Sequence, residues 1–425
     1  MAERYRSKHE AKTKTSKIII IIIIVLVALA AALGTGAYFL LNNLIAPDSS
    51  PAETSAMPSV AADTEAASEV YSEAPTEPSA AAKAKAYIAG MSEYEKICQL
   101  FIVTPEVLTG EDGVTLAGEQ TKASIEKYPV GGIVYFSSNL VDPEQTKAMI
   151  SNSQSYSKTP LFICVDEEGG SVARVAGELG TTEFDDMFSY HDQGSQTAYD
   201  NAKTIANDIS RFGFNLDFAP VADVWTNPDN TVIAERAYSD DYTQAADLVS
   251  AAVSGFNDGG VIPVLKHFPG HGDTIEDSHF GLAAVGRSVD EIKKEELLPF
   301  IKGIDSGTGM VMAGHLTVQA LDPDKPATLS SIVVPELLRG ELGYDGVVIT
   351  DSVSMQAITD NFRYDEIVKG IFDADIDMIL CPTDLDVYIG AVEAALKDGK
   401  ITNEQLEKKL LRILTLKYER GIMNI

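Results

Sequence analysis

The feature that most constrains the fold of this chain is an alternation of two patterns that runs from about residue 84 to the end. Short apolar runs typical of strands alternate with longer patterns typical of amphipathic helices. The strand-type runs are Gly132–Phe136, Leu161–Val165, Asn215–Pro220, Val261–Leu265, Gly309–Ala313, Gly346–Thr350 and Met378–Cys381. Runs that are continuously apolar and joined by helices indicate a parallel sheet covered on both faces. The predicted fold class is therefore α/β, either an open doubly wound sheet or a closed (β/α)₈ barrel.

Helical patterns lie before and between these runs. Among them are Met91–Val103, Ala198–Phe212, Tyr242–Asp258, Val289–Ile304 and Tyr364–Ala374. In the first pattern Ser92 is followed three residues later by Glu95, which is the sequence of a capping box. We expect a helix to begin at this pair.

Polar residues just beyond the strand-type runs favour the barrel. They are Asp166, Asp223, Lys266 with His267, His315 and Asp351. In a barrel the carboxyl ends of all strands meet at one rim, where enzymes of this architecture place their active sites. An open sheet would instead gather such residues at one switch point, and the chain has neither a GxGxxG nor a GxxxxGK[ST] motif for a nucleotide there. We predict a single TIM-type barrel over residues 85–425.

An uncharged run of 24 residues, Ile18–Leu41, precedes the alternating region. At about 1.5 Å per residue, a helix of this length crosses a hydrocarbon core of about 30 Å. The apolar part of a signal peptide is shorter, about 7 to 15 residues, so we predict a transmembrane signal-anchor helix. The basic residues of segment 1–17, and the lack of Lys or Arg from 18 to 82, predict a cytoplasmic tail and a single-pass position in the cell membrane. Everything after the helix is then extracellular.

Residues 42–84 are rich in Ala, Ser, Pro, Thr and Glu and show no sustained apolar period. This composition predicts a disordered acidic linker between the membrane helix and the barrel. The formal net charge of the chain is −30, which repels polyphosphates and argues against nucleic acid as a partner. The three cysteines, Cys98, Cys164 and Cys381, lie far apart in apolar runs, so we expect buried core residues and no disulfide framework.

The stretch Lys266–His279, with the sequence KHFPGHGDTIEDSH, holds three of the six histidines of the chain. The prolyl and glycyl residues in its middle exclude a regular helix or a continuing strand, so we predict a loop at a strand end. Asp277 and His279 are separated by one residue, and in extended backbone both side chains point to the same side. There the carboxylate can orient the imidazole and raise its basicity.

A zinc site is one alternative for this loop, because His267 and His271 have the i, i+4 spacing of a metal motif. That spacing serves a helix, and Pro269–Gly270 breaks any helix between the two histidines. We therefore expect neither a metal nor another cofactor. His271 is expected to stabilise the loop by hydrogen bonding.

Other polar residues at the rim allow two interpretations each. Asp351 follows a buried run and is either a helix N-cap or a catalytic carboxylate. Asp166 opens the acidic and glycyl stretch DEEGG, which serves either turn chemistry or the binding of hydroxyl groups. Arg236 is either a solvated loop charge or a clamp on a substrate oxygen.

Four segments together, VDEEGGSVARV, NLDFAPVADV, KHFPGHGDTIEDSH and VVITDSVSM, resemble glycoside hydrolase family 3, and within it the NagZ-type β-N-acetylglucosaminidases. The resemblance extends from about residue 91 to the end, and the histidine-rich loop is its most specific part. It implies that Asp351 is the nucleophile, that His279 is the general acid/base and that Asp277 is its partner. It further implies sugar-binding roles for Asp166, Arg174, Arg236, Lys266 and His267.

The resemblance and the predicted anchor together lead to one expected function. The chain is expected to be a membrane-anchored, extracellular, retaining glycosidase that removes terminal non-reducing β-N-acetylglucosamine from peptidoglycan-derived fragments, such as muropeptides, or from other glycans. Alternatives are a family 3 β-glucosidase, a glycoside phosphorylase and, outside the enzymes, a tethered sugar-binding protein. A monomer is favoured.

Overall fold

The computed structural model describes residues 77–274 and 281–424. The predicted tail 1–17, the predicted membrane helix 18–41 and most of the predicted linker lie outside the described residues, as do Asp277 and His279. Within the described ranges, no helix combines the length and the apolar character needed to cross a membrane. The chain divides into two units, Met1–Ala74 and Pro75–Ile425, and all described residues belong to the second.

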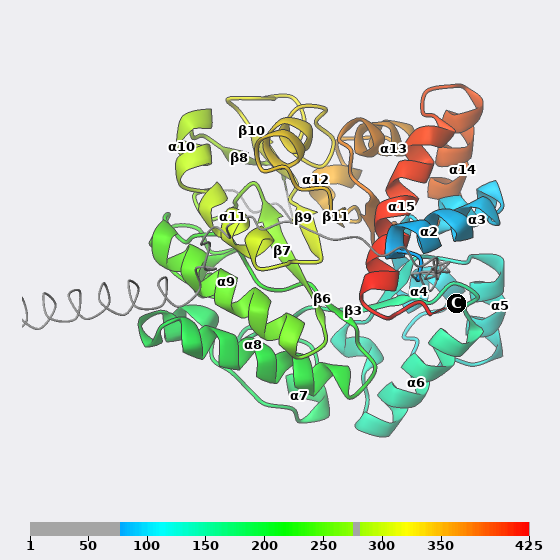
Figure 1. Cartoon of the computed structure of the whole chain (residues 1–425), viewed down its shortest axis with the longest axis horizontal. Helices are drawn as coiled ribbons and strands as arrows, with labels where there is room; N and C mark the ends of the chain where they lie inside the picture. The colour runs from blue at the N-terminus through cyan, green and yellow to red at the C-terminus, as the bar shows by residue number, and fades with distance from the viewer. Residues whose placement is uncertain (1–76, 275–280, 425) are drawn as a thin grey trace, which may run out of the picture. The chain divides into compact units, whose positions relative to one another are not determined.

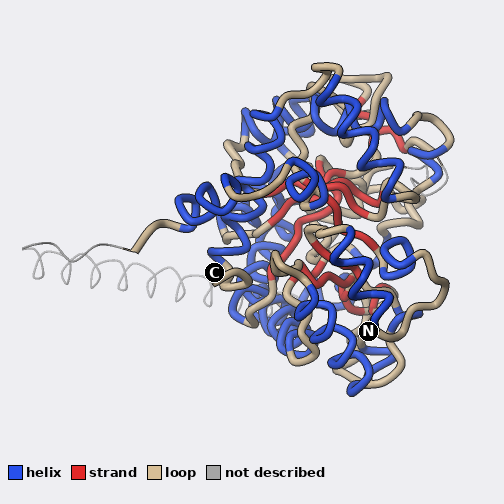
Figure 2. Tube along the Cα trace, turned by 90° about the vertical axis from the view of Figure 1, so that its right-hand side faces the viewer, coloured by secondary structure: helices blue, strands red, loops and turns tan. Residues whose placement is uncertain are grey.

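The second unit contains a closed barrel of parallel strands, as the sequence predicts. The hydrogen-bonded order around the barrel is β1-β12-β11-β9-β7-β6-β3-β2. The barrel strands are β1 Phe101–Val103, β2 Gly132–Val134, β3 Phe162–Val165, β6 Leu216–Asp217, β7 Ile262–Phe268, β9 Met310–Ala313, β11 Val347–Ser352 and β12 Met378–Leu380. Figure 2 shows the strands grouped in the interior with helices around them. Every described residue of β1, β2, β3 and β7 is buried, which explains why these runs are continuously apolar.

Helices cover the barrel and connect its strands (Figure 1). They are α2 Ala80–Ala89, α3 Glu93–Cys98, α4 Pro105–Thr109, α5 Glu119–Lys127, α6 Pro143–Tyr156, α7 Ala176–Leu179, α8 Ser195–Ser210, α9 Tyr242–Asp258, α10 Val289–Lys294, α11 Leu297–Asp305, α12 Gln356–Thr359, α13 Tyr364–Asp373, α14 Leu385–Lys397 and α15 Asn403–Glu419. Short 3-10 turns span Ser137–Asn139, Met187–Gln193 and Ala234–Arg236, and a π-helix spans Val333–Glu341. Two small strand pairs lie outside the barrel: β4 Glu167–Gly169 with β5 Val172–Ala173, and β8 Ala283–Val285 with β10 Leu316–Val318.

The predicted helix Met91–Val103 is wrong in its second half. The capping box of Ser92 and Glu95 forms as predicted and starts α3, but this helix ends at Cys98. Residues Phe101–Val103 form β1 instead, which pairs with β12 on one side and β2 on the other and so closes the barrel. Residues 101–103 form a strand because β12, far away in the sequence, pairs with them. The local apolar pattern does not show this pairing.

Other boundaries also differ from the predicted ones. Helix α2 begins at Ala80, inside the predicted linker 42–84, and it buries Ala84 and Ile88. The predicted helix Val289–Ile304 is divided into α10 and α11 at Glu295–Glu296. Strands β7 and β11 are longer than predicted, so Lys266, His267 and Asp351 lie within strands and not after them.

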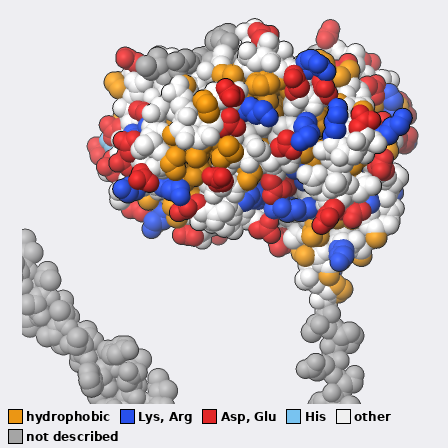
Figure 3. Space-filling model, turned by 90° about the horizontal axis from the view of Figure 1, so that it is seen from above, with side chains coloured by type: hydrophobic (Ala, Val, Ile, Leu, Met, Phe, Trp, Pro, Cys, Tyr) orange, Lys and Arg blue, Asp and Glu red, His pale blue; other side chains and the backbone are white. Residues whose placement is uncertain are grey.

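The surface of this unit carries both signs of charge. On the face in Figure 3, acidic and basic side chains are interspersed, with hydrophobic groups between them. The three cysteines are free and buried, as predicted.

Candidate active site

A pocket of about 380 Å³ lies at the carboxyl ends of the barrel strands. All six predicted site residues that the structure describes line it: Asp166, Arg174, Arg236, Lys266, His267 and Asp351. They come from the ends of β3, β7 and β11 and from the connections that follow β3 and β6. The volume lies within the range of small-molecule sites, roughly 300 to 1,000 Å³. The barrel rim therefore brings together residues that are up to 185 positions apart in the sequence.

A network of ion pairs forms one wall of this pocket. The Lys266 ammonium lies 2.8 Å from the Asp166 carboxylate and 2.5 Å from the Glu168 carboxylate. The Arg236 guanidinium donates two parallel hydrogen bonds to Glu168, at 2.8 and 2.7 Å. We call Asp166, Glu168, Arg236 and Lys266 the pocket network.

The pocket network keeps Glu168 and Lys266 charged although both are buried. Burial alone would raise the pKa of Glu168, but Arg236 and Lys266 hold it well below its ordinary value. Burial would likewise lower the pKa of Lys266, and the carboxylates of Asp166 and Glu168 raise it instead. The Lys266 side chain is only 3% exposed, whereas that of Asp166 is 21% exposed, so Asp166 is the member that faces solvent.

Arg174 reaches the pocket because a buried carboxylate holds the backbone around it. Glu167 accepts hydrogen bonds from the backbone N–H groups of Arg174, Val175 and Ala176, at 2.6, 2.6 and 2.9 Å. The Nε atom of Arg174 is buried and has no hydrogen-bond partner among the described residues. Since Arg174 lines the pocket, a ligand oxygen is one partner that can satisfy such a buried donor.

Asp223 supports the histidines of the loop. Its carboxylate accepts the backbone N–H of His267 and of His271, the latter at 2.7 Å, and lies 2.7 Å from His267 Nδ1. Because Nδ1 of His267 is engaged, Nε2 is the nitrogen left for a ligand. The ring of His271 binds the Thr274 hydroxyl at 2.6 Å, so His271 stabilises the loop as predicted.

Asp351 lies near the end of β11 with its carboxylate at the pocket. Its Oδ1 accepts the backbone N–H of Ser352 at 2.7 Å. Burial would raise the pKa of Asp351, but His315 and His267, together with this hydrogen bond, lower it. The alternative interpretation as a helix N-cap is wrong, because the next helix, α12, has Met355 at its N-cap. Asp351 is thus an anionic carboxylate that lines the pocket.

Three contributing residues receive no site role from the sequence. Glu168 is one of three acids in a glycyl stretch, and Asp223 and His315 are polar residues after strands that favour the barrel without a role in the site. His315 is fully buried and lies 2.9 Å from both the Thr328 hydroxyl and the Ser352 carbonyl oxygen. Their position after buried strands was the available signal, but the partners that define their roles are distant in sequence.

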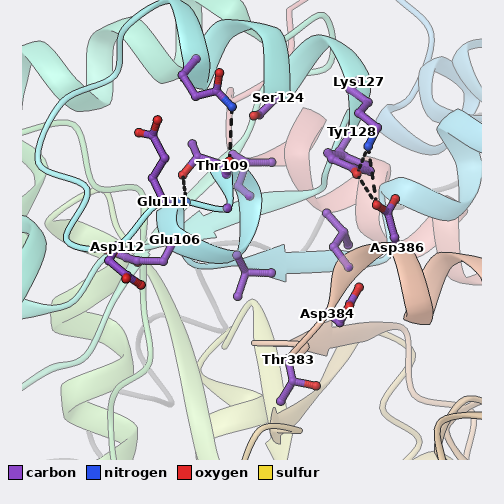
Figure 4. Close-up of a pocket in the computed structure, with 15 residues that line it drawn as sticks. Glu106, Thr109, Glu111, Asp112, Ser124, Lys127, Tyr128, Thr383, Asp384 and Asp386 are labelled. Carbon is purple, nitrogen blue, oxygen red and sulfur yellow. Dashed lines mark hydrogen bonds and ion pairs between the residues drawn. The ribbon is translucent and has the colours of Figure 1, made fainter.

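A larger pocket of about 570 Å³ adjoins α4, α5 and the start of α14 (Figure 4). Its acidic residues serve local structure: Glu106 accepts from Val114 N–H and the Asn139 amide, and Asp384 caps α14. Figure 4 shows Glu111 and Asp112 on one side of this pocket and Asp386, bonded to Tyr128, on the other. Since these groups do not converge, the smaller pocket is the better candidate for catalysis.

No cluster of three or more His, Cys, Asp or Glu side chains suited to a metal ion occurs within residues 77–274 and 281–424. The described part of the site offers the carboxylate of Asp351, the ion-paired carboxylates of the pocket network and several fixed hydrogen-bond donors. Such groups can bind hydroxyl groups and stabilise a developing charge.

Comparison with known proteins gives one family. The model of the glycosyl hydrolase family 3 N-terminal domain matches residues 92–416. β-Hexosaminidase A of Pseudoalteromonas piscicida is 38% identical over 322 residues, which cover 69% of this chain and 54% of that protein. β-Hexosaminidase LpqI of Mycobacterium tuberculosis is 33% identical over 338 residues, covering 77% of this chain and 83% of the relative. The chain thus spans about half the length of the Pseudoalteromonas protein.

Solved structures agree with this result. A glycoside hydrolase family 3 β-N-acetylglucosaminidase from Paenibacillus sp. str. FPU-7 has a TM-score of 0.74 and 35% identity, covering 78% of this chain and 63% of the other. The structure of M. tuberculosis LpqI has a TM-score of 0.71 and 30% identity, covering 80% of this chain and 96% of the other.

Proposed function

Since the chain belongs to glycoside hydrolase family 3, we propose that it is a retaining β-N-acetylhexosaminidase that releases terminal non-reducing β-N-acetylglucosamine. The observation that carries this proposal is the position of the anionic Asp351 in a pocket walled by fixed hydrogen-bonding groups. Most retaining glycosidases use such a carboxylate as their nucleophile.

The charges at the pocket suit a neutral sugar. Among the described residues that line it, three carboxylates face three cationic side chains of Lys and Arg. The pocket therefore offers no surplus of positive charge to an anionic ligand, and the chain as a whole is strongly acidic. Asp166 can accept hydrogen bonds from sugar hydroxyl groups, and Arg174, Arg236 and Lys266 can donate hydrogen bonds to sugar oxygens.

The proposed reaction has two steps. In the first, a carboxylate oxygen of Asp351 attacks the anomeric carbon while the glycosidic bond breaks, and His279 donates a proton to the leaving oxygen. In the second, His279 takes a proton from water, whose oxygen attacks the anomeric carbon and releases Asp351. Asp277 orients the imidazole of His279 in both steps. Two inversions at one carbon retain its β configuration.

We propose in addition that residues 18–41 anchor the chain in the cell membrane, with the barrel outside. The support is the uncharged sequence of that segment and the basic residues before it. A glycosidase in this location would act on wall-derived fragments such as muropeptides that end in N-acetylglucosamine.

The test uses the full-length protein in detergent with aryl β-N-acetylglucosaminide and aryl β-glucoside. The expected result is preferential cleavage of the former, with the β anomer as the first product in a time-resolved NMR spectrum. Equal rates on both glycosides would favour the β-glucosidase alternative. A sugar 1-phosphate formed in phosphate buffer would favour phosphorolysis, and sugar binding without turnover would favour a tethered binding protein.

A further inference from the structure

Strand β11 has one residue more than its neighbour β12 at the position of Asp351. The two strands pair at Ile349 and again at Ser352, but the register shifts between these positions. Thr350 and Asp351 of β11 therefore lie opposite a single residue of β12. On its other side β11 pairs with β9, and that register has no shift as far as Thr350. The proposed nucleophile thus lies in a β-bulge, a feature that changes the direction in which the side chains of a strand point.

A threonine side chain binds this bulge to β12. Thr350 is fully buried, and its hydroxyl oxygen accepts the backbone N–H of Leu380 at 3.1 Å. Beyond the bulge, the carbonyl oxygen of Leu380 accepts the Val353 N–H at 3.0 Å, so backbone pairing resumes there. These two hydrogen bonds hold the chain before and after Asp351.

A histidine side chain binds the bulge from the side of β9. His315 follows β9 in the chain and is fully buried. Its Nε2 lies 2.9 Å from the Ser352 carbonyl oxygen, and its Nδ1 lies 2.9 Å from the Thr328 hydroxyl. Because a carbonyl oxygen only accepts, Nε2 carries the proton of the first hydrogen bond. The ring is therefore held at both of its nitrogen atoms.

Ser352 joins this histidine to the proposed nucleophile. Its carbonyl oxygen binds His315, and its backbone N–H donates to Asp351 Oδ1 at 2.7 Å. The imidazole thus holds the residue whose N–H orients the carboxylate. The charges agree with this arrangement, because burial raises the pKa of Asp351 and His315 is the strongest of the groups that lower it.

We propose that His315 and Thr350 are positioning residues for the nucleophile. They bind the bulge from its two sides and so direct the Asp351 carboxylate into the pocket. Thr328 in turn fixes the orientation of the His315 ring. This inference rests on the role proposed above for Asp351.

The first test compares two variants of His315 in the full-length protein. A glutamine can place its amide N–H where Nε2 lies and so keeps the hydrogen bond to Ser352, whereas the shorter asparagine places its amide near Nδ1 and loses it. We expect His315→Asn to lower kcat/KM on phenyl β-N-acetylglucosaminide roughly a hundredfold, and His315→Gln less than about tenfold. The inhibition constant of free N-acetylglucosamine should stay within about threefold of wild type in both, because the sugar-binding groups are unchanged.

The second test removes one hydroxyl group and keeps the shape of the side chain. Thr350→Val loses the hydrogen bond to Leu380. The matched control is Thr308→Val, which loses the hydrogen bond of another buried threonine, to the Pro263 carbonyl oxygen just before β9. Thr350→Val should lower kcat/KM at least about tenfold, and Thr308→Val less than about twofold.

The leaving group separates this role from one in proton transfer. Substrates with good and with poor leaving groups both need the attack by Asp351. His315→Asn and Thr350→Val should therefore lower kcat/KM on phenyl and on 2,4-dinitrophenyl β-N-acetylglucosaminide by factors that agree within about threefold. A loss confined to the phenyl substrate would overturn the inference, because it indicates a defect in protonation.

Equal activity of Thr350→Val and Thr308→Val would also overturn the inference. A rise in the inhibition constant that matches the loss in kcat/KM would do the same, since it indicates a general change of the pocket. If His315→Asn does not fold, Thr350→Val decides alone.

Wild-type protein that cleaves no N-acetylglucosaminide would overturn the proposed function instead. The crystal structure of Thr350→Val then decides the inference. An Asp351 carboxylate turned away from its wild-type position supports it, and an unmoved carboxylate contradicts it.

Discussion

The two ends of the barrel each contain a network of buried acidic and basic side chains, and they use it differently. At the carboxyl ends of the strands, the pocket network pairs side chains with one another around a cavity. At the amino ends of β11 and β12, Arg339, Arg412, Asp375 and Asp377 form what we call the base network.

The base network binds the backbone. Asp377 accepts the Val348 N–H and an Arg339 N–H, both at 2.8 Å. Arg339 donates in turn to the carbonyl oxygens of Tyr344 and Gly346, at 2.9 and 2.7 Å. These hydrogen bonds stabilise the turns that lead into β11 and β12.

The comparison shows that a buried ion-pair network does not by itself indicate catalysis. The two networks have similar residue types and burial, so the distinction lies in what else their groups bind. In the base network Arg339 and Asp377 bind each other and the backbone that leads into β11, whereas the pocket network lies beside the pocket that Asp351 also lines, where its groups can meet a ligand. This matches the general division of a barrel into a catalytic and a stabilising end.

The largest expected effect is that of Asp351→Ala at the pocket end. It should lower kcat/KM on an aryl β-N-acetylglucosaminide at least about a thousandfold, because the nucleophile is lost, while the melting temperature changes by only a few degrees. The matched control at the base end is Asp345→Ala, whose side chain is 85% exposed and binds Arg412. Full activity of Asp351→Ala would remove the distinction between the two ends.

Asp377→Asn at the base end should act on stability. It leaves Arg339 and Arg412 without their buried partner, which lowers the free energy of unfolding by about 3 kcal/mol. Urea unfolding measures this loss, and kinetics well below the melting temperature should give kcat/KM within about twofold of wild type. A tenfold loss of activity in fully folded protein would show that the base network also acts on the site.

Glu168→Gln, in contrast to Asp377→Asn, should lower activity in the folded protein. The amide cannot hold both Arg236 and Lys266, so these groups shift within the pocket, and kcat/KM should fall by roughly tenfold to a hundredfold. Steady-state kinetics with wild type, Glu168→Gln and Asp377→Asn side by side measures the contrast. If the two variants lost activity equally, the separation of binding and stabilising charges would be wrong.

The last effect changes stability with pH and leaves the site untouched. It concerns Lys417, another buried residue at the base end, which donates to Gln99 and to the Gly131 carbonyl oxygen. Burial lowers its pKa from 10.5 to about 7. Between these two pKa values the unfolded chain holds a proton that the folded chain has lost. The free energy of unfolding therefore rises with pH in this range, by at most about 1.4 kcal/mol per pH unit. Below pH 7 this group adds no pH dependence, because both states hold the proton.

Lys417→Met removes this titration. The free energy of unfolding of the variant minus that of wild type should therefore decrease from pH 7 to pH 10, as measured by urea unfolding at each pH. A constant difference would mean that Lys417 remains charged inside the folded protein.

Sequence patterns predicted the features that depend on residues close together in the chain. Continuous apolar runs predicted most barrel strands, since a strand buried on both faces has no polar side. The pair Ser92 and Glu95 predicted a helix start, because a capping box is formed within four residues. Polar residues at strand ends predicted the rim, and six described candidates do line one pocket.

The tertiary structure decided everything that depends on distant partners. The strand β1 is a strand because β12, almost 280 positions later, lies beside it, and no local pattern records that pairing. Likewise, Lys266 is a member of the pocket network because it meets Asp166, 100 positions earlier. The sequence by itself determined an α/β barrel with a polar rim, since periodicity and capping act over a few residues. Only the closed barrel determined which charged side chains pair with one another, which can bind a ligand and which bind backbone. The partners in these contacts are distant in sequence and meet only in the folded chain.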